Sequence, residues 1–314
     1  MNALGKKRIP FLFVLDYQLQ HPAILPLDHV KPEEIRYSIN GVTNVANPEK
    51  LAKQLDFNFT PVDFKRYKKA FNLVQQHILH GNSFLLNLTM PSTVVCNYSL
   101  KEIFASSHAK YKLWFKDQFV VYSPEIFIQT KGRKISSFPM KGTIDAKLPD
   151  AKNILLSSKK EVAEHHTIVD LIRNDLSRVA KKVRVTRFQY IDHIKTNKRE
   201  LLQMSSEVSG ELPADYHEHL GDIIFNLLPA GSISGAPKTK TLEIIQEAEQ
   251  YDRGYFTGIF GIFDGQNIDS GVMIRFIEKT STGLIYKSGG GITSQSDCTQ
   301  EYEELKNKIY VPVA

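Results

Sequence analysis

The sequence contains little cysteine: only Cys96 and Cys298 occur in 314 residues. Two cysteines are too few for a disulfide framework, and they lack the four-ligand pattern of a structural zinc site. No small-residue cleavage site follows the short apolar stretch at 11–15, which argues against a signal peptide. We therefore expect two unpaired thiols in a reducing, cytoplasmic compartment.

Long apolar runs are also missing. A membrane-spanning helix needs about 20 consecutive apolar residues, and the strongest run in this sequence is the short one at 11–15. The chain has no low-complexity linker and no repeat with a period of about 20–50 residues. We therefore expect no membrane association and a single domain over residues 1–314, although at about 150 residues per domain the length alone would allow two.

Charge of one sign is not concentrated in any segment. The chain has 40 basic and 34 acidic residues, a net charge of +6, and the basic residues are spread among helix-like and strand-like patterns. No zinc finger, helix-turn-helix or base-stacking motif accompanies them. We therefore expect no nucleic-acid partner, and the positive charge is compatible with a small anionic substrate.

Hydrophobic periodicity predicts an α+β protein. Helical spacing predicts helices at 62–80, 161–179, 214–227, 237–250 and 298–309. Aromatic and β-branched residues predict strands at 9–16, 84–95, 111–122, 125–138, 183–191, 201–211, 255–263, 268–278 and 284–288. Because the strands come in consecutive blocks, antiparallel sheets are favoured over a doubly wound parallel sheet.

The last predicted helix carries a pattern suited to a metal ion. It follows Gly289, Gly290 and Gly291, and Glu301, Glu304 and Lys308 lie on one of its faces because they are spaced by three and four residues. Two carboxylates one turn apart can hold Mg²⁺ through oxygen ligands, and a lysine one turn further can pair with a substrate carboxylate. The alternative is an ordinary solvated Glu–Lys pair.

Lys141 is a candidate nucleophile. It stands in Pro139–Thr143, where few polar neighbours would solvate it; burial would lower its pKa and make the neutral amine reactive. The alternative is a surface lysine at the end of a strand. Glu125 precedes the same predicted hairpin and is a candidate general acid for that lysine.

Two further segments have weaker patterns. Glu164 lies early in a predicted helix, where a carboxylate is either functional or simply favoured by the helix dipole. The adjacent His165 and His166 do not have the spacing of a zinc pair. The segment 231–238 fails the phosphate-loop pattern, because Ala236 and Pro237 replace the required glycine and its neighbour, so ATP binding is not supported.

These segments together resemble the chorismate-utilising enzymes. The resemblance covers roughly residues 60–314, and its motifs appear in order at 123–125, 139–143, 164–178, 231–238, 253–258, 274–275, 289–292 and 301–304. It implies an α+β fold of large antiparallel sheets packed together with helices outside. A lysine at position 141 is typical of the aminodeoxychorismate-forming branch, whereas the branches that form anthranilate, isochorismate or salicylate usually have a small residue there.

The resemblance also implies roles for individual residues. Lys141 would be the nucleophile that attacks chorismate and Glu125 the acid that protonates its leaving hydroxyl, after which ammonia from a partner glutamine amidotransferase subunit would displace the lysine. Mg²⁺ would be held by Glu164 and Glu304, with Glu301 in or just behind the coordination sphere. The substrate would be contacted by Gly142, Thr143, Tyr255, Arg275, Gly289, Gly290, Gly291 and Lys308.

The sequence departs from the family pattern in several places, of which two bear on the function. The first 60 residues match weakly, which indicates a shortened N-terminal region. Gln203 occupies a position where the family often has a histidine, and glutamine cannot transfer a proton. Two alternatives therefore stay open: an anthranilate or isochorismate synthase-type enzyme, and a non-catalytic chorismate-binding subunit.

Overall fold

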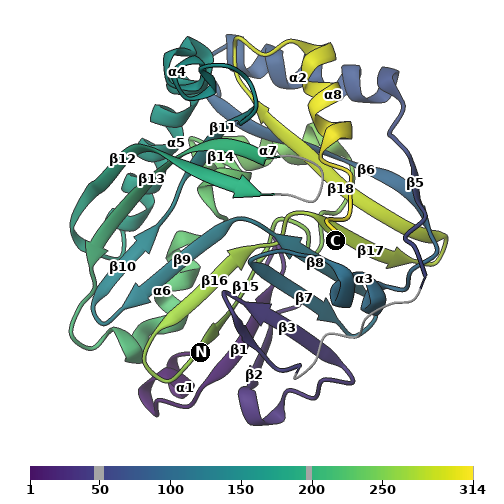
Figure 1. The fold of residues 1–314 in the computed structure, drawn as a ribbon. Helices are drawn as coiled ribbons and strands as arrows, with labels where there is room; N and C mark the ends of the chain where they lie inside the picture. Colours follow the sequence, from purple (N-terminus) through teal and green to yellow (C-terminus); the bar gives the residue numbers. More distant parts are fainter. Residues whose placement is uncertain (46–52, 196–199, 314) are drawn as a thin grey trace. The chain divides into compact units, whose positions relative to one another are not determined.

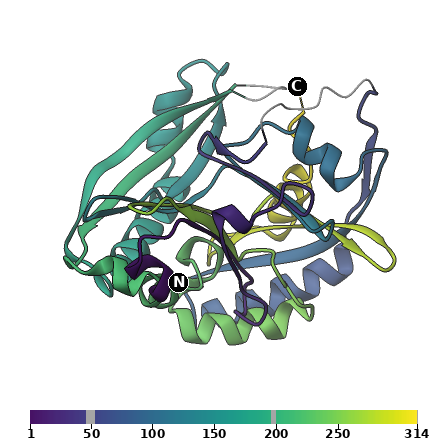
Figure 2. The same cartoon turned by 90° about the horizontal axis from the view of Figure 1, so that it is seen from below.

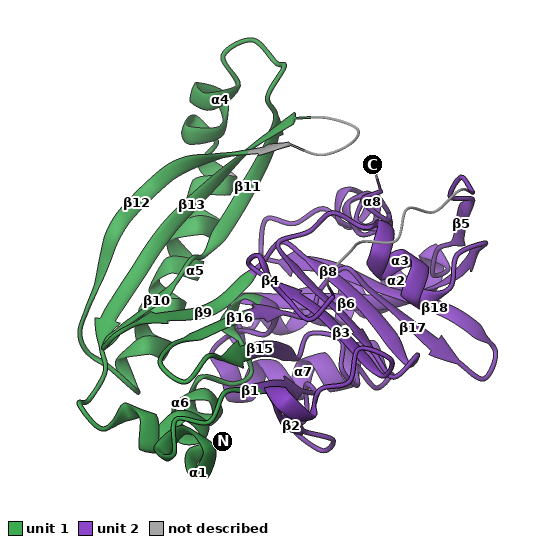
Figure 3. Cartoon of the chain, turned by 60° about the horizontal axis from the view of Figure 1, so that its bottom comes forward, with its two compact units in different colours: residues 1–11, 126–232, 262–270 green, residues 12–125, 233–261, 271–314 purple. Residues whose placement is uncertain are grey.

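The computed structural model describes residues 1–45, 53–195 and 200–313, and these divide into two compact units (Figure 3). Unit 1 comprises residues 1–11, 126–232 and 262–270, and unit 2 comprises residues 12–125, 233–261 and 271–314. Each unit is therefore assembled from three separate stretches of chain. The expectation of one functional domain over 1–314 stays a prediction.

The strands form two large antiparallel sheets, as the order of strand blocks predicted (Figure 1). The first has the order β11–β13–β10–β9–β16–β15–β1–β2, with β12 paired to β13. The second has the order β14–β6–β18–β17–β8–β7–β3–β4, with β5 paired to β6.

The elements of unit 1 are α1 (Asn2–Lys6), β9 (Ile126–Lys131), β10 (Lys134–Ser137), β11 (Met140–Asp145), α4 (Ala151–Ser157), α5 (Lys159–Ser177), β12 (Lys181–Lys195), β13 (Glu200–Glu211), η2 (Tyr216–His219) and α6 (Leu220–Leu227). A unit boundary falls inside β1 (Phe11–Leu15), η3 (Gly231–Ile233), β15 (Ile259–Phe263) and β16 (Ile268–Val272).

The elements of unit 2 are β2 (Ala23–Pro26), η1 (Leu27–His29), β3 (Ile35–Ile39), β4 (Val42–Thr43), β5 (Phe57–Thr60), α2 (Phe64–Leu79), β6 (Leu85–Cys96), α3 (Leu100–Ser106), β7 (Tyr111–Phe115), β8 (Phe119–Ser123), β14 (Gly235–Ala236), α7 (Lys238–Glu249), β17 (Phe276–Thr280), β18 (Gly283–Ile292) and α8 (Cys298–Asn307).

Most predicted helices are confirmed, and local signals explain their ends. In α2 the side chain of Asp63 accepts hydrogen bonds from the backbone of Lys65 and Arg66, and Gly81 follows the helix with a positive φ of 77°. In α8 Asp297 accepts from the backbone of Gln300. The helix predicted at 214–227 is a short 3₁₀ turn, η2, followed by α6.

Some strand predictions were wrong in detail. The stretch 111–122 is not one strand but two, β7 and β8, because Lys116 and Asp117 both have positive φ and form the tight turn of a hairpin. Likewise 268–278 contains β16 and the start of β17. The strands between residues 23 and 60 and the helices α1, α3 and α4 were not predicted.

In unit 2 the helices cover one face of the second sheet. Figures 1 and 2 show α2 and α7 side by side, and both pack on β6. Alternate residues of β6, among them Leu86, Leu88 and Met90, point into the apolar core formed with α2, α3, α7 and α8. The described residues contain no helix that is both long and apolar enough to span a membrane.

A buried ion pair closes the C-terminal end of α7. Arg253 and Glu249 are 2% and 1% exposed, and their closest nitrogen and oxygen atoms are 2.6 Å apart. The guanidinium also donates to the carbonyls of Ile233 and Asn87, and the carboxylate accepts from the backbone N–H of Thr89. Although burial opposes the charge of Arg253, Glu249 raises the pKa of the guanidinium, which therefore stays ionised.

We predict that Glu249→Gln lowers the free energy of unfolding by about 3 kcal/mol, because it leaves a buried guanidinium without its counter-ion. Urea denaturation checks this. The matched control is Glu243→Gln on the same helix, whose pair with Lys240 is exposed and should contribute at most about 0.5 kcal/mol. Equal losses in the two variants would contradict the prediction.

Candidate functional site

The candidate site residues fall into two groups, one in each unit. Unit 1 contains Lys141, Gly142, Thr143 and Glu164; unit 2 contains Glu125, Tyr255, Arg275, Gly289, Gly290, Gly291, Glu301, Glu304 and Lys308. Each group is described within its own unit below.

In unit 1, Lys141 lies at an irregularity of the sheet. Strand β11 pairs with β13, but the register shifts between Met140, opposite Ser205, and Thr143, opposite Gln203. The intervening Gly142 has a positive φ of 80°, which suits glycine. Such a bulge re-aims the side chains of a strand, and Lys141 is thereby directed to helix α5.

The partner of Lys141 on α5 is Glu164. The Nζ of Lys141 and Oε2 of Glu164 are 2.7 Å apart, and their side chains are 24% and 8% exposed. The burial of both side chains shows that Lys141 is not the freely solvated surface lysine of the alternative interpretation. It also places one predicted metal ligand against the predicted nucleophile.

Sequence reasoning missed Glu161, which lies one helical turn before Glu164. A Cβ built on Gly142 would lie 3.1 Å from Oε2 of Glu161, so this carboxylate is next to the lysine-bearing bulge. The spacing of three residues on one helix was the available signal. Glu301 and Glu304, which the sequence predicts as candidate metal ligands, have the same spacing.

His165, next to Glu164, is fully buried, whereas His166 is exposed. Burial lowers the pKa of His165 to about 4, so its ring is neutral at neutral pH. Its Nε2 is 2.7 Å from Oγ of Ser206. Two adjacent histidines with opposite exposure do not form a metal pair, in agreement with the sequence argument.

In unit 2 three charged side chains of the last helix segment converge on Gly290. A Cβ built on this glycine would lie 3.4 Å from Oε2 of Glu301, 3.4 Å from Oε1 of Glu304 and 3.6 Å from Nζ of Lys308. Glu301 is only 3% exposed and accepts a hydrogen bond from Ser296. Lys308 pairs with Glu304 at 2.7 Å and donates to the carbonyl of Gly289.

Buried phenols hold the chain that follows α8. The hydroxyl of Tyr286 donates to the carbonyl of Lys308, and that of Tyr122 donates to the carbonyl of Tyr310. Arg275, which has a positive φ of 56°, donates from Nε to the hydroxyl of Tyr310. Because Tyr122 lies on β8, Tyr286 on β18 and Arg275 immediately before β17, the second sheet fixes Lys308 and Arg275.

Tyr255, another predicted site residue of unit 2, lies against aromatic side chains. Its ring packs against Phe115 and Phe119, and its hydroxyl donates to the carbonyl of His21. None of the motifs in the sequence indicated this aromatic packing of Tyr255. Glu125 immediately precedes β9, and its carbonyl accepts from the backbone of Val272. The role of each of these residues stays a prediction.

The carboxylates provide the kind of donor that Mg²⁺ prefers, namely oxygen, and at Gly290 two of them face one point. This donor chemistry fits the predicted ion. In the part of the chain that the structure describes, no three His, Cys, Asp or Glu side chains gather as a group able to hold a metal ion. The Mg²⁺ site therefore stays a prediction.

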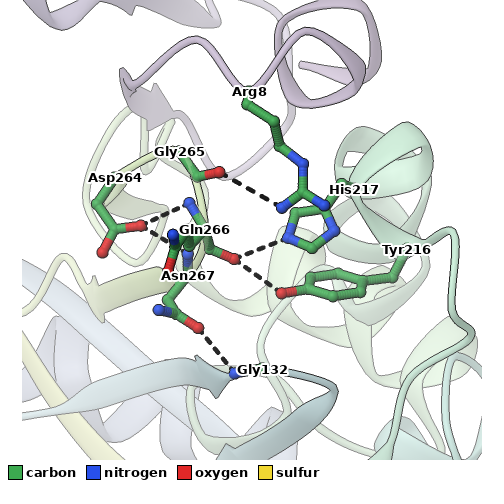
Figure 4. A pocket seen from close by; sticks show the side chains of 8 residues that line it. All are labelled: Arg8, Gly132, Tyr216, His217, Asp264, Gly265, Gln266 and Asn267. Atoms are coloured by element: carbon green, nitrogen blue, oxygen red, sulfur yellow. Dashed lines mark hydrogen bonds between the residues drawn. The ribbon is translucent and has the colours of Figure 1, made fainter.

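A pocket of about 690 Å³ in unit 1 contains none of the predicted site residues (Figure 4). The polar groups that line it form hydrogen bonds with one another. Tyr216 and His217 both bind the carbonyl of Gln266, and the carboxylate of Asp264 accepts from the backbone of Gln266 and Asn267. These bonds fasten η2 to the β15–β16 turn. We interpret the pocket as a structural junction.

The family model for chorismate binding enzymes matches residues 24–314. The chain is 50% identical, over 99% of its length and 95% of the relative's, to an uncharacterized PabA-like protein of Haemophilus influenzae. It is 32% identical to aminodeoxychorismate synthase component 1 of Bacillus subtilis, over 78% of this chain and 54% of that protein, so it spans about half of that longer relative. The fold is similar to that of a solved structure, a putative isochorismate synthase, DhbC, from Bacillus anthracis. The two superpose with a TM-score of 0.73 at 21% identity, over 98% of this chain and 86% of that one.

Two neighbouring glycines allow a test of the geometry at β18. A Cβ on Gly289 would lie 2.1 Å from the carbonyl oxygen of Leu88, which is sterically forbidden, whereas a Cβ on Gly290 meets only ordinary contacts. We predict that Gly289→Ala lowers the free energy of unfolding by about 1–3 kcal/mol or more. Gly290→Ala should change it by less than about 1 kcal/mol. Urea denaturation of both variants measures the difference, and a larger loss for Gly290→Ala would show that the β18 geometry is wrong.

Proposed function

Since the chain belongs to the chorismate-binding enzyme family, we propose that it aminates chorismate with ammonia to give 4-amino-4-deoxychorismate, the precursor of para-aminobenzoate for folate biosynthesis. The observation that carries this proposal is Lys141, which the bulge in β11 directs to Glu164. The adjacent carboxylate can take the proton that Lys141 must lose before its neutral amine acts as a nucleophile in covalent catalysis. The enzyme is thus proposed to be an aminodeoxychorismate synthase of the component 1 type.

The proposed reaction has two substitutions. The neutral amine of Lys141 bonds to C2 of the ring while the C4 hydroxyl leaves, and Glu125 donates the proton with which that hydroxyl departs as water. Ammonia then bonds to C4 and the bond between C2 and Lys141 breaks, which regenerates the lysine. The net reaction exchanges water for ammonia and requires no oxidant.

The remaining site residues are proposed to bind the dianionic substrate. Arg275 and Lys308 would pair with its carboxylates, and Gly142, Thr143, Tyr255 and the backbone of Gly289, Gly290 and Gly291 would complete the binding surface. Mg²⁺, when bound by Glu164 and Glu304 with Glu301 or Glu161 beside them, would neutralise the ring carboxylate.

Ammonia is proposed to come from a separate glutamine amidotransferase subunit. The chain has no Cys–His–Glu pattern of such a glutaminase. The name PabA-like carried by the relatives from Haemophilus influenzae and Pasteurella multocida is compatible with this pairing. Free ammonium should replace the partner in a reconstituted assay.

The first test replaces the nucleophile. With chorismate, Mg²⁺ and an ammonium salt at alkaline pH, the wild-type protein should form 4-amino-4-deoxychorismate, and Lys141→Ala should form it roughly 10³-fold more slowly or not at all, because the covalent route is lost. Mass spectrometry identifies the product.

The control for this test is Lys134→Ala, an exposed lysine on β10 that pairs with Glu207. It should retain wild-type turnover. Anthranilate or isochorismate from the wild type would reassign the protein to a sister activity. If the wild type forms no product even with glutamine and a glutaminase subunit, the chain is a non-catalytic chorismate-binding subunit.

A second test concerns the cation. Glu304→Gln removes a proposed ligand, so the Mg²⁺ concentration for half-maximal turnover should rise at least about tenfold. Glu303→Gln, on the neighbouring position of α8 and paired with Lys306, is the matched control and should leave it unchanged. An unaltered Mg²⁺ requirement in Glu304→Gln would remove this residue from the proposed metal site.

A further inference from the structure

We infer that Ser206 and His165 form a buried bridge that positions Lys141 and Glu164 against each other. The inference rests on the proposed function for its catalytic consequence, but the bridge itself is a geometric feature of unit 1. Ser206 and His165 are both fully buried and bind each other, whereas Lys141 binds Glu164. They are therefore positioning residues.

Ser206 is connected to both halves of the lysine–glutamate pair. Its backbone N–H donates to the carbonyl of Pro139, two residues before Lys141, at 3.0 Å. Its side-chain oxygen is 2.7 Å from Nε2 of His165, the residue after Glu164. One residue of β13 thus holds the strand that carries the nucleophile and the helix that carries its partner.

The hydroxyl of Ser206 has a second contact that fixes its direction. The backbone N–H of Gln189, on β12, donates to the same oxygen at 3.0 Å. With that oxygen accepting from β12, the hydroxyl proton is available for the ring nitrogen of His165. The bridge therefore joins β11, β12, β13 and α5 at one buried point.

Such a connection matters at this position because the ladder around Lys141 is interrupted. Between Met140 and Thr143 the β11–β13 register shifts, so the regular pairing of the two strands is interrupted at Lys141 and Gly142. The bond from Ser206 to Pro139 fixes the strand just before this gap. A displacement of about 1 Å in a reacting group can cost about 10²-fold in rate. Loss of the Ser206 hydroxyl, which holds α5 through His165 while the backbone bond to Pro139 remains, should therefore have a kinetic consequence.

The adjacent Ser205 provides a matched comparison. It is also on β13 and fully buried, but its hydroxyl has no hydrogen-bond partner. Ser205→Ala and Ser206→Ala therefore remove the same atom from the same strand, and only the second breaks the bridge. This pair separates positioning from general packing.

The experiment uses the full chain and two readouts. The first is steady-state amination of chorismate with ammonium, from which kcat and KM are obtained. The second is the rate at which Lys141 is acylated by acetic anhydride without substrate, followed by peptide mass spectrometry. The acylation readout does not depend on the proposed reaction.

We expect Ser206→Ala to lower kcat by about 10- to 100-fold while KM for chorismate changes less than threefold. Lys141 should be acylated at least about threefold faster, because Glu164 no longer holds it. Ser205→Ala should match the wild type in both readouts.

His165 is tested by two substitutions of different chemistry. His165→Gln can place its amide oxygen near the position of Nε2, where it accepts from the Ser206 hydroxyl, and should retain most of the activity, whereas His165→Leu fills the space without a hydrogen bond and should behave like Ser206→Ala. If Ser206→Ala does not fold, Ser206→Cys keeps the volume with a much weaker hydrogen bond and is expected to show the same changes.

The outcomes are distinguishable. If acylation of Lys141 is equally fast in Ser206→Ala and Ser205→Ala, the bridge does not position the pair and the inference is overturned. If the wild type does not aminate chorismate but the acylation difference is observed, the proposed function fails while the positioning role stands. If His165→Leu and His165→Gln are equal in both readouts, the hydrogen bond has no positioning role and only the volume of the ring matters.

Discussion

The guanidinium of Arg253 and the carboxylate of Glu249 meet where several segments of unit 2 come together. The pair binds the backbone of Asn87, Thr89 and Ile233, and Thr89 lies opposite Gly289 in the β6–β18 ladder. A fully buried ion pair has few alternative partners, so it specifies one arrangement. The register that this arrangement supports presents Gly290 to the charged face of α8. The site geometry of this unit thus depends on an interaction that contains no candidate catalytic residue.

In each unit a lysine pairs with one of the candidate metal-binding carboxylates. Glu164 is paired with Lys141 in unit 1, and Glu304 is paired with Lys308 in unit 2, each at 2.7 Å. The side chain of Glu164 is 8% exposed and that of Glu304 is 48% exposed, so only Glu164 is a buried carboxylate that needs the lysine as a counter-charge. In the proposed reaction the dication offers Glu164 and Glu304 a new partner and the dianionic substrate offers one to Lys308, whereas Lys141 gives up its proton and reacts as the neutral amine. Binding would then exchange ion pairs without leaving any charge uncompensated.

Local signals explain which parts of the fold could be predicted. Helices α2 and α8 combine an acidic N-cap with an apolar stripe, and both were predicted to within a few residues. The hairpin turn at Lys116 and Asp117 was missed because these residues are not the usual glycine or asparagine of such turns. The strands β2 to β5 were missed because they are only two to five residues long, and neighbouring strands rather than local preference hold them in place.

The sequence by itself determined the family, the antiparallel α+β class and the chemical character of Lys141, Glu164 and Glu304, because these depend on residue type and spacing within one element. Only the tertiary structure decided which groups meet: that a bulge turns Lys141 to Glu164, that Ser206 joins Pro139 to His165, and that three charges converge on Gly290. The physical reason is that such contacts depend on strand register, in which a shift of one residue reverses every side chain. Register is set by long-range packing, and no local pattern in the sequence contains it.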